Sequence, residues 1–79
     1  MKVLYFARLR EAFGESESIG IATDTRVAEI VSSLKARGGE WEKELSRPFR
    51  VAINRKLAGM DAIVKDDDEV AIFPPVTGG

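Results

Sequence analysis

The sequence predicts an α+β domain in which a mixed β-sheet of about five strands carries one main helix on one face. Two hydrophobic runs, residues 2–8 and 69–74, are rich in branched and aromatic side chains and are typical of buried strands. Between them, the hydrophobic residues of 27–34 recur at i, i+3, i+4 and i+7, which is the spacing of an amphipathic helix. Neither terminal strand alternates cleanly, so we expect both to be central in the sheet.

The segments between these runs predict the remaining elements. In chain order we expect a strand at 2–8, one or two helical turns at 9–14, a strand at 15–22, the main helix from Thr25 to Arg37, a short helix at 40–45, a strand at 48–54, a turn and short strand at 54–59, and a strand at 69–74. Asp24 or Thr25 is the expected N-cap of the main helix, and Gly38-Gly39 its stop. Trp41 lies one turn from Leu45 in the short helix and is expected to be a satellite of the core.

Composition restricts the chemistry that this chain can perform by itself. The 79 residues, 44% of them hydrophobic, suit one small domain. There is no cysteine, which excludes disulfides and thiolate metal sites, and no histidine, the commonest general base and metal ligand. Twelve basic and thirteen acidic residues give a net charge of −1 without a basic stripe, which argues against a nucleic-acid partner.

The first residues, MKVLYFARLR, contain only a short apolar run. Such a run is too short for a signal peptide or a membrane span. We therefore expect a cytoplasmic protein with no membrane partner.

The chain ends in FPPVTGG, which divides it into a domain at 1–73 and a tail at 74–79. Pro74-Pro75 fixes φ and favours an extended course, so we expect the tail to project. Fully extended, the tail reaches roughly 20 Å at roughly 3.3 Å per residue, which is the depth of an active-site tunnel. The terminal Gly78-Gly79 has no side chain to collide with tunnel walls, whereas Gly38-Gly39 is explained by its position after a helix.

A C-terminal carboxyl at the end of such a tail is a possible reactive group. It is ionised at neutral pH, because its pKa is ordinarily about 3.5. The carboxylate can attack the α-phosphate of ATP to give an acyl adenylate, which a sulfur or nitrogen nucleophile then displaces. These steps require only an accessible end from this chain, which fits a sequence without histidine or cysteine.

From VLYFARLRE near the start, through Trp41 and VAIN at 51–54, to the closing DEVAIFPPVTGG, the sequence resembles the small subunit of molybdopterin synthase. That subunit is the sulfur carrier of molybdenum cofactor biosynthesis. The resemblance covers nearly the whole chain, and EVAIFPPVTGG is its most specific part, because related carriers share the Gly-Gly but generally not PPVTGG. The family implies a β-grasp, ubiquitin-like fold, which agrees with the element order.

The resemblance also implies a mechanism in which every catalytic side chain belongs to a partner. An activating enzyme of the E1 type would use ATP to adenylate Gly79, and a sulfur donor protein would convert the adenylate to a thiocarboxylate. The large subunit would then transfer the sulfur to cyclic pyranopterin monophosphate, in a heterotetramer of two small and two large subunits. No cofactor or metal is expected on this chain. The partner's channel would hold the tail residues Pro74, Pro75, Val76, Thr77 and Gly78.

Three alternative functions remain open at this stage. The chain could be a ubiquitin-like modifier that is linked through Gly79 to lysines of target proteins. It could be the sulfur carrier of the thiamine pathway, although its length and the PPVTGG ending argue against that. It could also be a plain β-grasp interaction domain whose tail is incidental.

The aromatic residues of the two central strands predict an interface. Neighbouring side chains in a strand face opposite sides of the sheet. Tyr5 and Phe6 must therefore lie on opposite faces, and so must Ile72 and Phe73. One helix covers only one face. We therefore expect Phe6 and Phe73 to form an exposed patch on the other face, where a partner binds.

The acidic run at 66–69 is expected to be a solvated turn. Three adjacent carboxylates point in different directions, which disfavours metal binding, and steering of a basic partner is a second possibility. The family usually has a glycine in this turn, where this chain has Asp66-Asp67-Asp68. Because aspartate is among the few residues that tolerate a positive φ, we expect the turn to survive at some cost.

Overall fold

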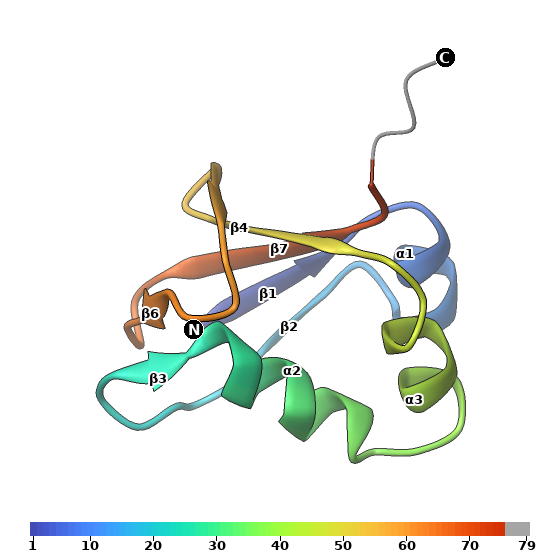
Figure 1. Cartoon of the computed structure of the whole chain (residues 1–79), viewed down its shortest axis with the longest axis horizontal. Coiled ribbons are helices and arrows are strands. Elements are labelled where there is room, and N and C mark those ends of the chain that lie inside the picture. Colours follow the sequence, from blue (N-terminus) through green and yellow to red (C-terminus); the bar gives the residue numbers. More distant parts are fainter. Residues whose placement is uncertain (76–79) are drawn as a thin grey trace.

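The structure, a computed structural model, describes residues 1–75 and confirms the expected α+β architecture (Figure 1). Its main sheet has five strands, listed here in spatial order: β2 Ser16–Ser18, β1 Lys2–Tyr5, β7 Glu69–Phe73, β4 Arg50–Ile53 and β5 Lys56–Ala58. The helices are α1 Arg8–Phe13, α2 Val27–Lys35 and α3 Glu40–Leu45. A separate two-stranded sheet pairs β3 Thr25–Arg26 with β6 Ile63–Val64.

The first and last strands of the chain are neighbours in the middle of the main sheet. β1 runs parallel to β7, with Lys2 opposite Glu69 and Tyr5 opposite Ile72. On its other edge β7 pairs with β4, and on its other edge β1 pairs with β2. Both of these pairings are antiparallel. The sheet is therefore mixed, and the prediction that both terminal strands are central is confirmed.

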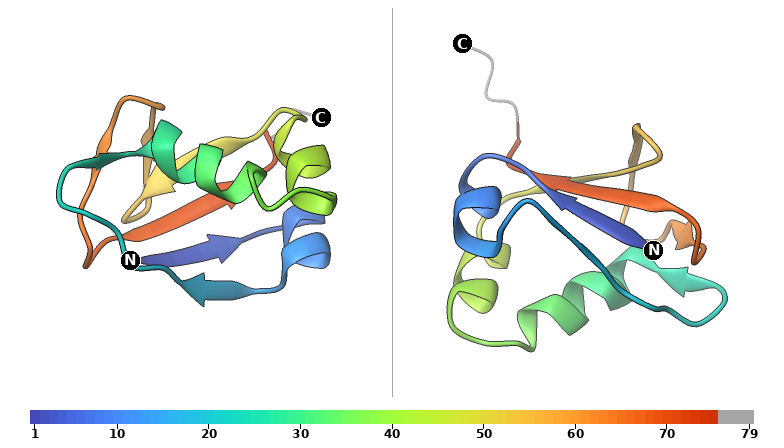
Figure 2. Two further views of the ribbon diagram at one scale, coloured as in Figure 1. Left: turned by 90° about the horizontal axis from the view of Figure 1, so that it is seen from below. Right: turned by 180° about the vertical axis from the view of Figure 1, so that it is seen from behind.

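The helix α2 lies across one face of the main sheet and closes the core (Figures 1 and 2). Its buried residues are Val27, Ile30, Val31 and Leu34, which confirms the stripe expected from their spacing. The buried residues that the central strands contribute to the same core are Val3, Tyr5, Val51, Val70 and Ile72. Removing such side chains from water stabilises the fold by about 1.5–3 kcal/mol each.

The expected N-cap of the main helix is wrong. The helix begins at Val27 with Arg26 as its N-cap, because Thr25 and Arg26 first pair with β6. The Thr25 hydroxyl donates to the Ala22 carbonyl at 2.6 Å and is therefore committed to the preceding loop. The carboxylate of Glu29 accepts the Arg26 amide at 3.0 Å and takes over part of the capping.

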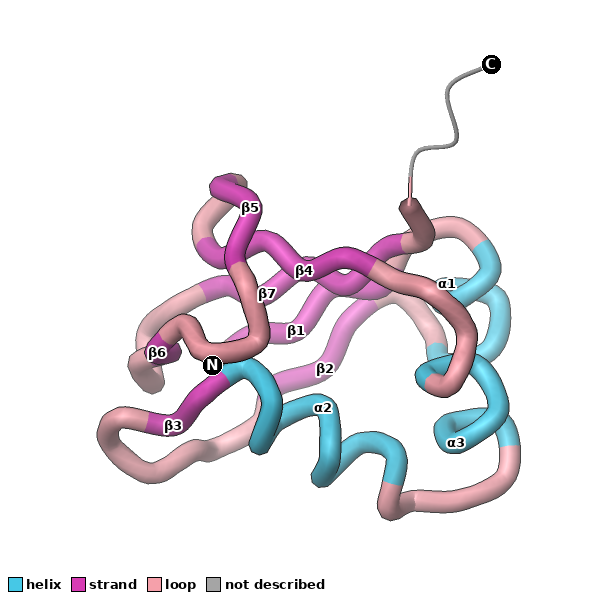
Figure 3. Tube along the Cα trace, in the orientation of Figure 1, coloured by secondary structure: helices cyan, strands magenta, loops and turns pink. Residues whose placement is uncertain are grey.

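Several other elements are shorter than expected; Figure 3 distinguishes the helices and strands from the loops. The first strand ends at Tyr5 instead of residue 8, because α1 begins at Arg8, and the strand expected at 15–22 covers only Ser16–Ser18. The main helix ends at Lys35, before the expected stop, although Gly38 and Gly39 both have positive φ as a helix exit requires. The strands β3 and β6 were not expected at all. Two-residue strands carry no periodicity that a sequence pattern could reveal.

Trp41 belongs to an aromatic cluster beside the core, as expected. Its ring stacks on Phe13 with centroids 3.8 Å apart, and Tyr5 meets both rings edge-on. The Arg37 guanidinium lies 4.4 Å from the Trp41 ring and binds both carboxylate oxygens of Glu17, at 2.6 and 3.1 Å. Burial raises the pKa of the Tyr5 hydroxyl. The cluster thus ties α1, α3 and β2 to the central strand β1.

A buried carboxylate fixes the approach to β4. The Glu44 side chain is only 6% exposed and lies 3.3 Å from Arg47 and 3.8 Å from Arg8. Arg8 also donates to the Pro48 carbonyl at 2.6 Å. The chain entering β4 is therefore anchored to the start of α1 by Arg8.

The turn between β4 and β5 holds two residues in the left-handed region. Asn54 and Arg55 have φ of 49° and 71°, and Ile53 pairs with Lys56 across the turn. Two-residue hairpins favour this geometry, with Asn-Gly as the preferred pair. The Asn54 side chain also accepts the Glu69 amide at 3.0 Å. Asn54 is therefore well suited to its position, whereas Arg55 is strained.

The acidic turn differs from the expectation in its backbone. None of Asp66, Asp67 and Asp68 has a positive φ, so the turn does not carry the expected strain. Asp66 and Asp68 also have structural partners. The Asp66 carboxylate accepts the Met1 amino group at 3.2 Å, and that of Asp68 accepts the Lys65 amide at 2.9 Å. The turn is exposed, as expected, but two of its carboxylates accept hydrogen bonds from other parts of the chain.

We predict that Arg55→Gly raises the free energy of unfolding by about 0.5–1 kcal/mol, because glycine removes the left-handed strain at a smaller entropic cost. Urea unfolding of the two proteins measures the difference. Arg55→Ala is the matched control, since alanine keeps the strain while removing the same charge. A gain in Arg55→Ala equal to that in Arg55→Gly would show that charge, not backbone conformation, is responsible.

We predict that the fold loses stability in acid partly through Asp68. The pKa of Asp68 lies below its ordinary value in the folded state, mainly because its carboxylate accepts the Lys65 amide and secondly because it accepts the Asn54 side-chain amide. A depressed folded-state pKa contributes stability above the unfolded-state pKa, and this contribution is lost as the pH falls through the folded-state pKa. Urea unfolding between pH 7 and pH 2 should therefore show a shallower decline in Asp68→Asn than in the parent. Parallel curves would contradict the assignment.

Candidate functional site

The base of the C-terminal tail is the end of β7, the central strand. Val70 and Ile72 anchor β7 in the core, and its two edges are paired with β1 and β4. Pro74 and Pro75 have no amide hydrogen and so cannot extend either ladder. The chain leaves the sheet here, at the end where α1 lies and on the side away from α2 (Figures 1 and 2). The tail therefore starts from a fixed point.

The residues expected to react lie beyond this point. Gly79, Gly78, Thr77 and Val76 are outside the described residues, so their predicted roles stay predictions. The division into a domain at 1–73 and a tail beginning at Pro74 is likewise an expectation. The described part of the tail, Pro74 and Pro75, is half-buried against the end of the sheet.

The structure separates the aromatic residues of the central strands as expected. Tyr5 and Ile72 are buried beneath the helices, whereas Phe6 is 44% exposed and Phe73 is half-buried on the opposite face. The Phe6 amide donates to the Ile72 carbonyl at 3.2 Å, which continues the β1–β7 register by one step and brings Phe6 next to Phe73. The two expected interface residues therefore form one patch beside the start of the tail.

Leu57 extends this patch and was missed by sequence reasoning. It lies on β5 and is 68% exposed. A row of directly opposite residues runs across the sheet from Leu57 to Ala52 of β4, Ala71 of β7 and Leu4 of β1. Two alanines in the middle of this row leave a shallow apolar surface between Leu57 and the phenylalanines. The sequence feature that could have revealed the exposure of Leu57 is the turn at Asn54 and Arg55, because this turn fixes the register of β5. We call Leu4, Phe6, Ala52, Leu57, Ala71 and Phe73 the outer face.

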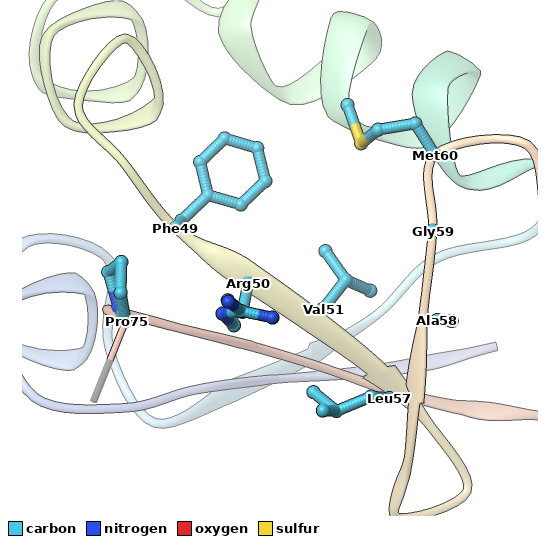
Figure 4. Close-up of a pocket in the computed structure, with 8 residues that line it drawn as sticks. All are labelled: Phe49, Arg50, Val51, Leu57, Ala58, Gly59, Met60 and Pro75. Atoms are coloured by element: carbon cyan, nitrogen blue, oxygen red, sulfur yellow. The ribbon is translucent and has the colours of Figure 1, made fainter. Parts of the chain in front are cut away.

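A hollow of about 560 Å³ adjoins the outer face, between the start of β4 and the segment that follows β5 (Figure 4). We call it the β4 notch. Its lining residues are Phe49, Arg50, Val51, Leu57, Ala58, Gly59, Met60 and Pro75. Since Pro75 is among them, the notch lies directly beside the departing tail.

The ionisable residues are the ones that could bind a metal ion or have a shifted pKa value. Within residues 1–75 there is no group of three or more histidine, cysteine, aspartate or glutamate residues that could hold a metal ion. The shifted pKa values belong to Tyr5, Arg37, Asp66 and Asp68, none of which lies on the outer face. In the same range, no helix combines the length and apolar character that crossing a membrane requires. What distinguishes the outer face is its exposed apolar side chains, Phe6 and Leu57.

A five-stranded mixed sheet that wraps one helix, with its last strand in the centre, is a β-grasp, ubiquitin-like fold. The chain belongs to the ThiS family, whose sequence model matches residues 3–79. The match therefore includes the C-terminal Gly-Gly.

Individual relatives agree with this family. The chain is 41% identical to the molybdopterin synthase sulfur carrier subunit of Haemophilus influenzae, with 100% of this chain and 99% of that protein covered. A structure from Pyrococcus furiosus, described as molybdopterin converting factor subunit 1, superposes with a TM-score of 0.80 at 31% identity and 95% coverage of both chains. A chain from the complex of molybdopterin-converting factor subunits 1 and 2 of Helicobacter pylori superposes at 0.69, with 29% identity and coverage of 99% and 96%.

A different kind of protein shares the fold. The small archaeal modifier protein 1 of Haloferax volcanii superposes with a TM-score of 0.70 at 25% identity, with 95% of both chains covered. Fold similarity alone therefore does not separate a carrier from a modifier.

We predict that the two faces of the sheet respond differently to substitution. Ile72→Ala should lower the free energy of unfolding by about 2–5 kcal/mol, because it removes buried methyl groups from the core. Leu57→Ala should change it by no more than about 0.5 kcal/mol, because that side chain is mostly in solvent. Urea unfolding measures both. A large loss in Leu57→Ala would mean that the outer face is structural and not a binding surface.

Proposed function

We propose that this chain is a molybdopterin synthase sulfur carrier subunit whose reactive group is the carboxyl of Gly79. The observation that carries the proposal is the full-length similarity to a sulfur carrier subunit, at 41% identity. The family match that reaches residue 79 supports it, because it includes the Gly-Gly end that the chemistry requires.

The proposed reaction sequence uses the carboxyl in three steps. Its oxygen attacks the α-phosphate of ATP in an E1-like adenylating enzyme, which forms the acyl adenylate and releases pyrophosphate. A hydrosulfide ion supplied by a donor protein attacks the acyl carbon, and AMP leaves with the electron pair of the broken C–O bond, so that Gly79 carries a thiocarboxylate. The large subunit then uses the sulfur of two such thiocarboxylates, one for each C–S bond, to convert cyclic pyranopterin monophosphate into the dithiolene. Water supplies the oxygen that regenerates each carboxylate.

In this proposal the chain carries and positions the reacting carboxyl, and the catalytic side chains belong to its partners. Residues Pro74 to Gly78 serve as the spacer in the partner's channel, and Phe6, Leu57 and Phe73 of the outer face bind the large subunit. Two copies of each subunit form the synthase in this proposal, which places the complex in the cytoplasm, where ATP is available. The chain binds no cofactor of its own, and the activating partner consumes the ATP.

A ubiquitin-like modifier is the second candidate, favoured by the similarity to the archaeal modifier protein. Both functions begin with adenylation of Gly79 but leave different products. A sulfur carrier accumulates a form in which one oxygen is replaced by sulfur, whereas a modifier gives a ladder of high-mass conjugates on a denaturing gel. A thiamine-pathway carrier is distinguished by which auxotroph the chain rescues.

We predict that deletion of Gly79 abolishes rescue of a strain that lacks its own sulfur carrier subunit and therefore makes no molybdenum cofactor. The truncated chain should keep the parent's urea-unfolding curve, because the buried core is formed by residues between Met1 and Ile72. Activity of a molybdoenzyme in cell extract measures the rescue.

Gly20→Ala is the matched control for this deletion. Gly20 has open space around its α-carbon and no positive φ, so alanine fits there and the variant should rescue fully. If the truncated chain rescues as well as the control, the tail is incidental and the proposal fails. If the parent instead rescues only a thiamine auxotroph, the assignment to molybdopterin synthesis fails.

A further inference from the structure

The backbone of Phe49 has an unused pair of hydrogen-bonding groups. The Asn54 amide donates to Glu69 of β7, so in β4 the even-numbered residues bond toward β7 and the odd-numbered residues toward β5. Ile53 and Val51 find their partners in β5, opposite Lys56 and Ala58. Phe49 is the next odd-numbered residue, and among residues 1–75 neither its amide nor its carbonyl has a partner.

The described chain cannot supply the missing partner. The strand β5 ends at Ala58, and the residues that would continue it turn away toward α2. The Met60 carbonyl accepts the Ala28 amide at 2.9 Å, and the Ala62 carbonyl accepts the Val27 amide at 3.0 Å. These bonds hold the segment against the helix, so that the edge of β4 at Phe49 opens into the β4 notch.

The surroundings of this open edge define what could fill it. Met60 and Leu57 are 43% and 68% exposed on either side of the notch, where they present apolar surface (Figure 4). Arg50, also in the lining, has no acidic partner within the described range. An open strand edge selects an extended backbone, the apolar walls select an aliphatic side chain, and the guanidinium selects a carboxylate.

The notch is also continuous with the outer face. Arg50 pairs with Phe73, and Leu57 belongs to both surfaces. A partner that covers Phe6 and Phe73 would therefore reach the notch without a gap.

We propose that the β4 notch binds an extended segment of the large subunit, which pairs with the Phe49 backbone, places an aliphatic side chain against Met60 and Leu57, and directs an acidic side chain to Arg50. This proposal rests on the proposed function for the identity of the partner. It adds a docking element that the tail and the outer face do not include. The segment would fix the orientation of the carrier while the tail is engaged.

Hydrogen exchange of the Phe49 amide tests the pairing directly. The uniformly ¹⁵N-labelled chain is measured by NMR alone and with saturating cognate large subunit. In the free chain the Phe49 amide should exchange quickly, because it has no acceptor, and in the complex it should slow by at least about tenfold.

Two substitutions test the chemistry of the segment by calorimetric titration with the large subunit. Met60→Glu and Arg50→Glu should each weaken binding by at least about tenfold, because one puts a charge into the apolar wall and the other repels the expected carboxylate. Lys43→Glu is the matched control, since it reverses an exposed charge on α3, away from the notch, and it should bind like the parent.

The outcomes separate the two proposals. A complex that forms with unchanged Phe49 exchange and unchanged affinity in both notch variants, but that Phe73→Ser weakens, overturns the notch and leaves the proposed function standing. A parent chain that binds no large subunit overturns both. Slowed exchange together with selective loss in the notch variants supports the proposal.

Discussion

The central position of β7 is the constraint on which the rest of the structure depends. Because β7 pairs with β1 on one edge and β4 on the other, and buries Val70 and Ile72 beneath the helices, its end cannot move independently of the core. The two prolines that follow stop both ladders at the same point. Any group carried beyond Pro75 therefore starts from a strand that is paired on both edges, as the proposed delivery into a partner's active site requires.

The same strand determines where the outer face lies. Its alternation sends Ile72 into the core and Phe73 to the outer face, and the register with β1 brings Phe6 alongside. Alanines at 52 and 71 then keep the surface shallow as far as Leu57. The start of the tail and the outer face are thus built from one strand and its neighbours. In the proposed function, a partner that binds the outer face would therefore also contact the sheet beside Pro74 and Pro75.

The sequence predicts the parts of this arrangement that have a period or a distinctive residue. The stripe at 27–34 identifies α2, the apolar runs identify β1 and β7, and alternation alone places Phe6 and Phe73 outside the core. Contacts between distant segments could not be predicted in this way. The pairing of β3 with β6 displaces the helix start to Val27, and only the register of β5 exposes Leu57. The open backbone at Phe49 is invisible in sequence, because it depends on where β5 ends in space.

The most direct measurement is the mass of the C-terminal tryptic peptide after charging. The chain is incubated with ATP, the adenylating enzyme and a sulfur source, and is then cleaved after Lys65, which releases residues 66–79 intact. If Gly79 is the carrier of sulfur, this peptide alone gains the mass difference between sulfur and oxygen, and only when ATP is present. An unmodified C-terminal peptide, or sulfur found in any other peptide, would contradict the account.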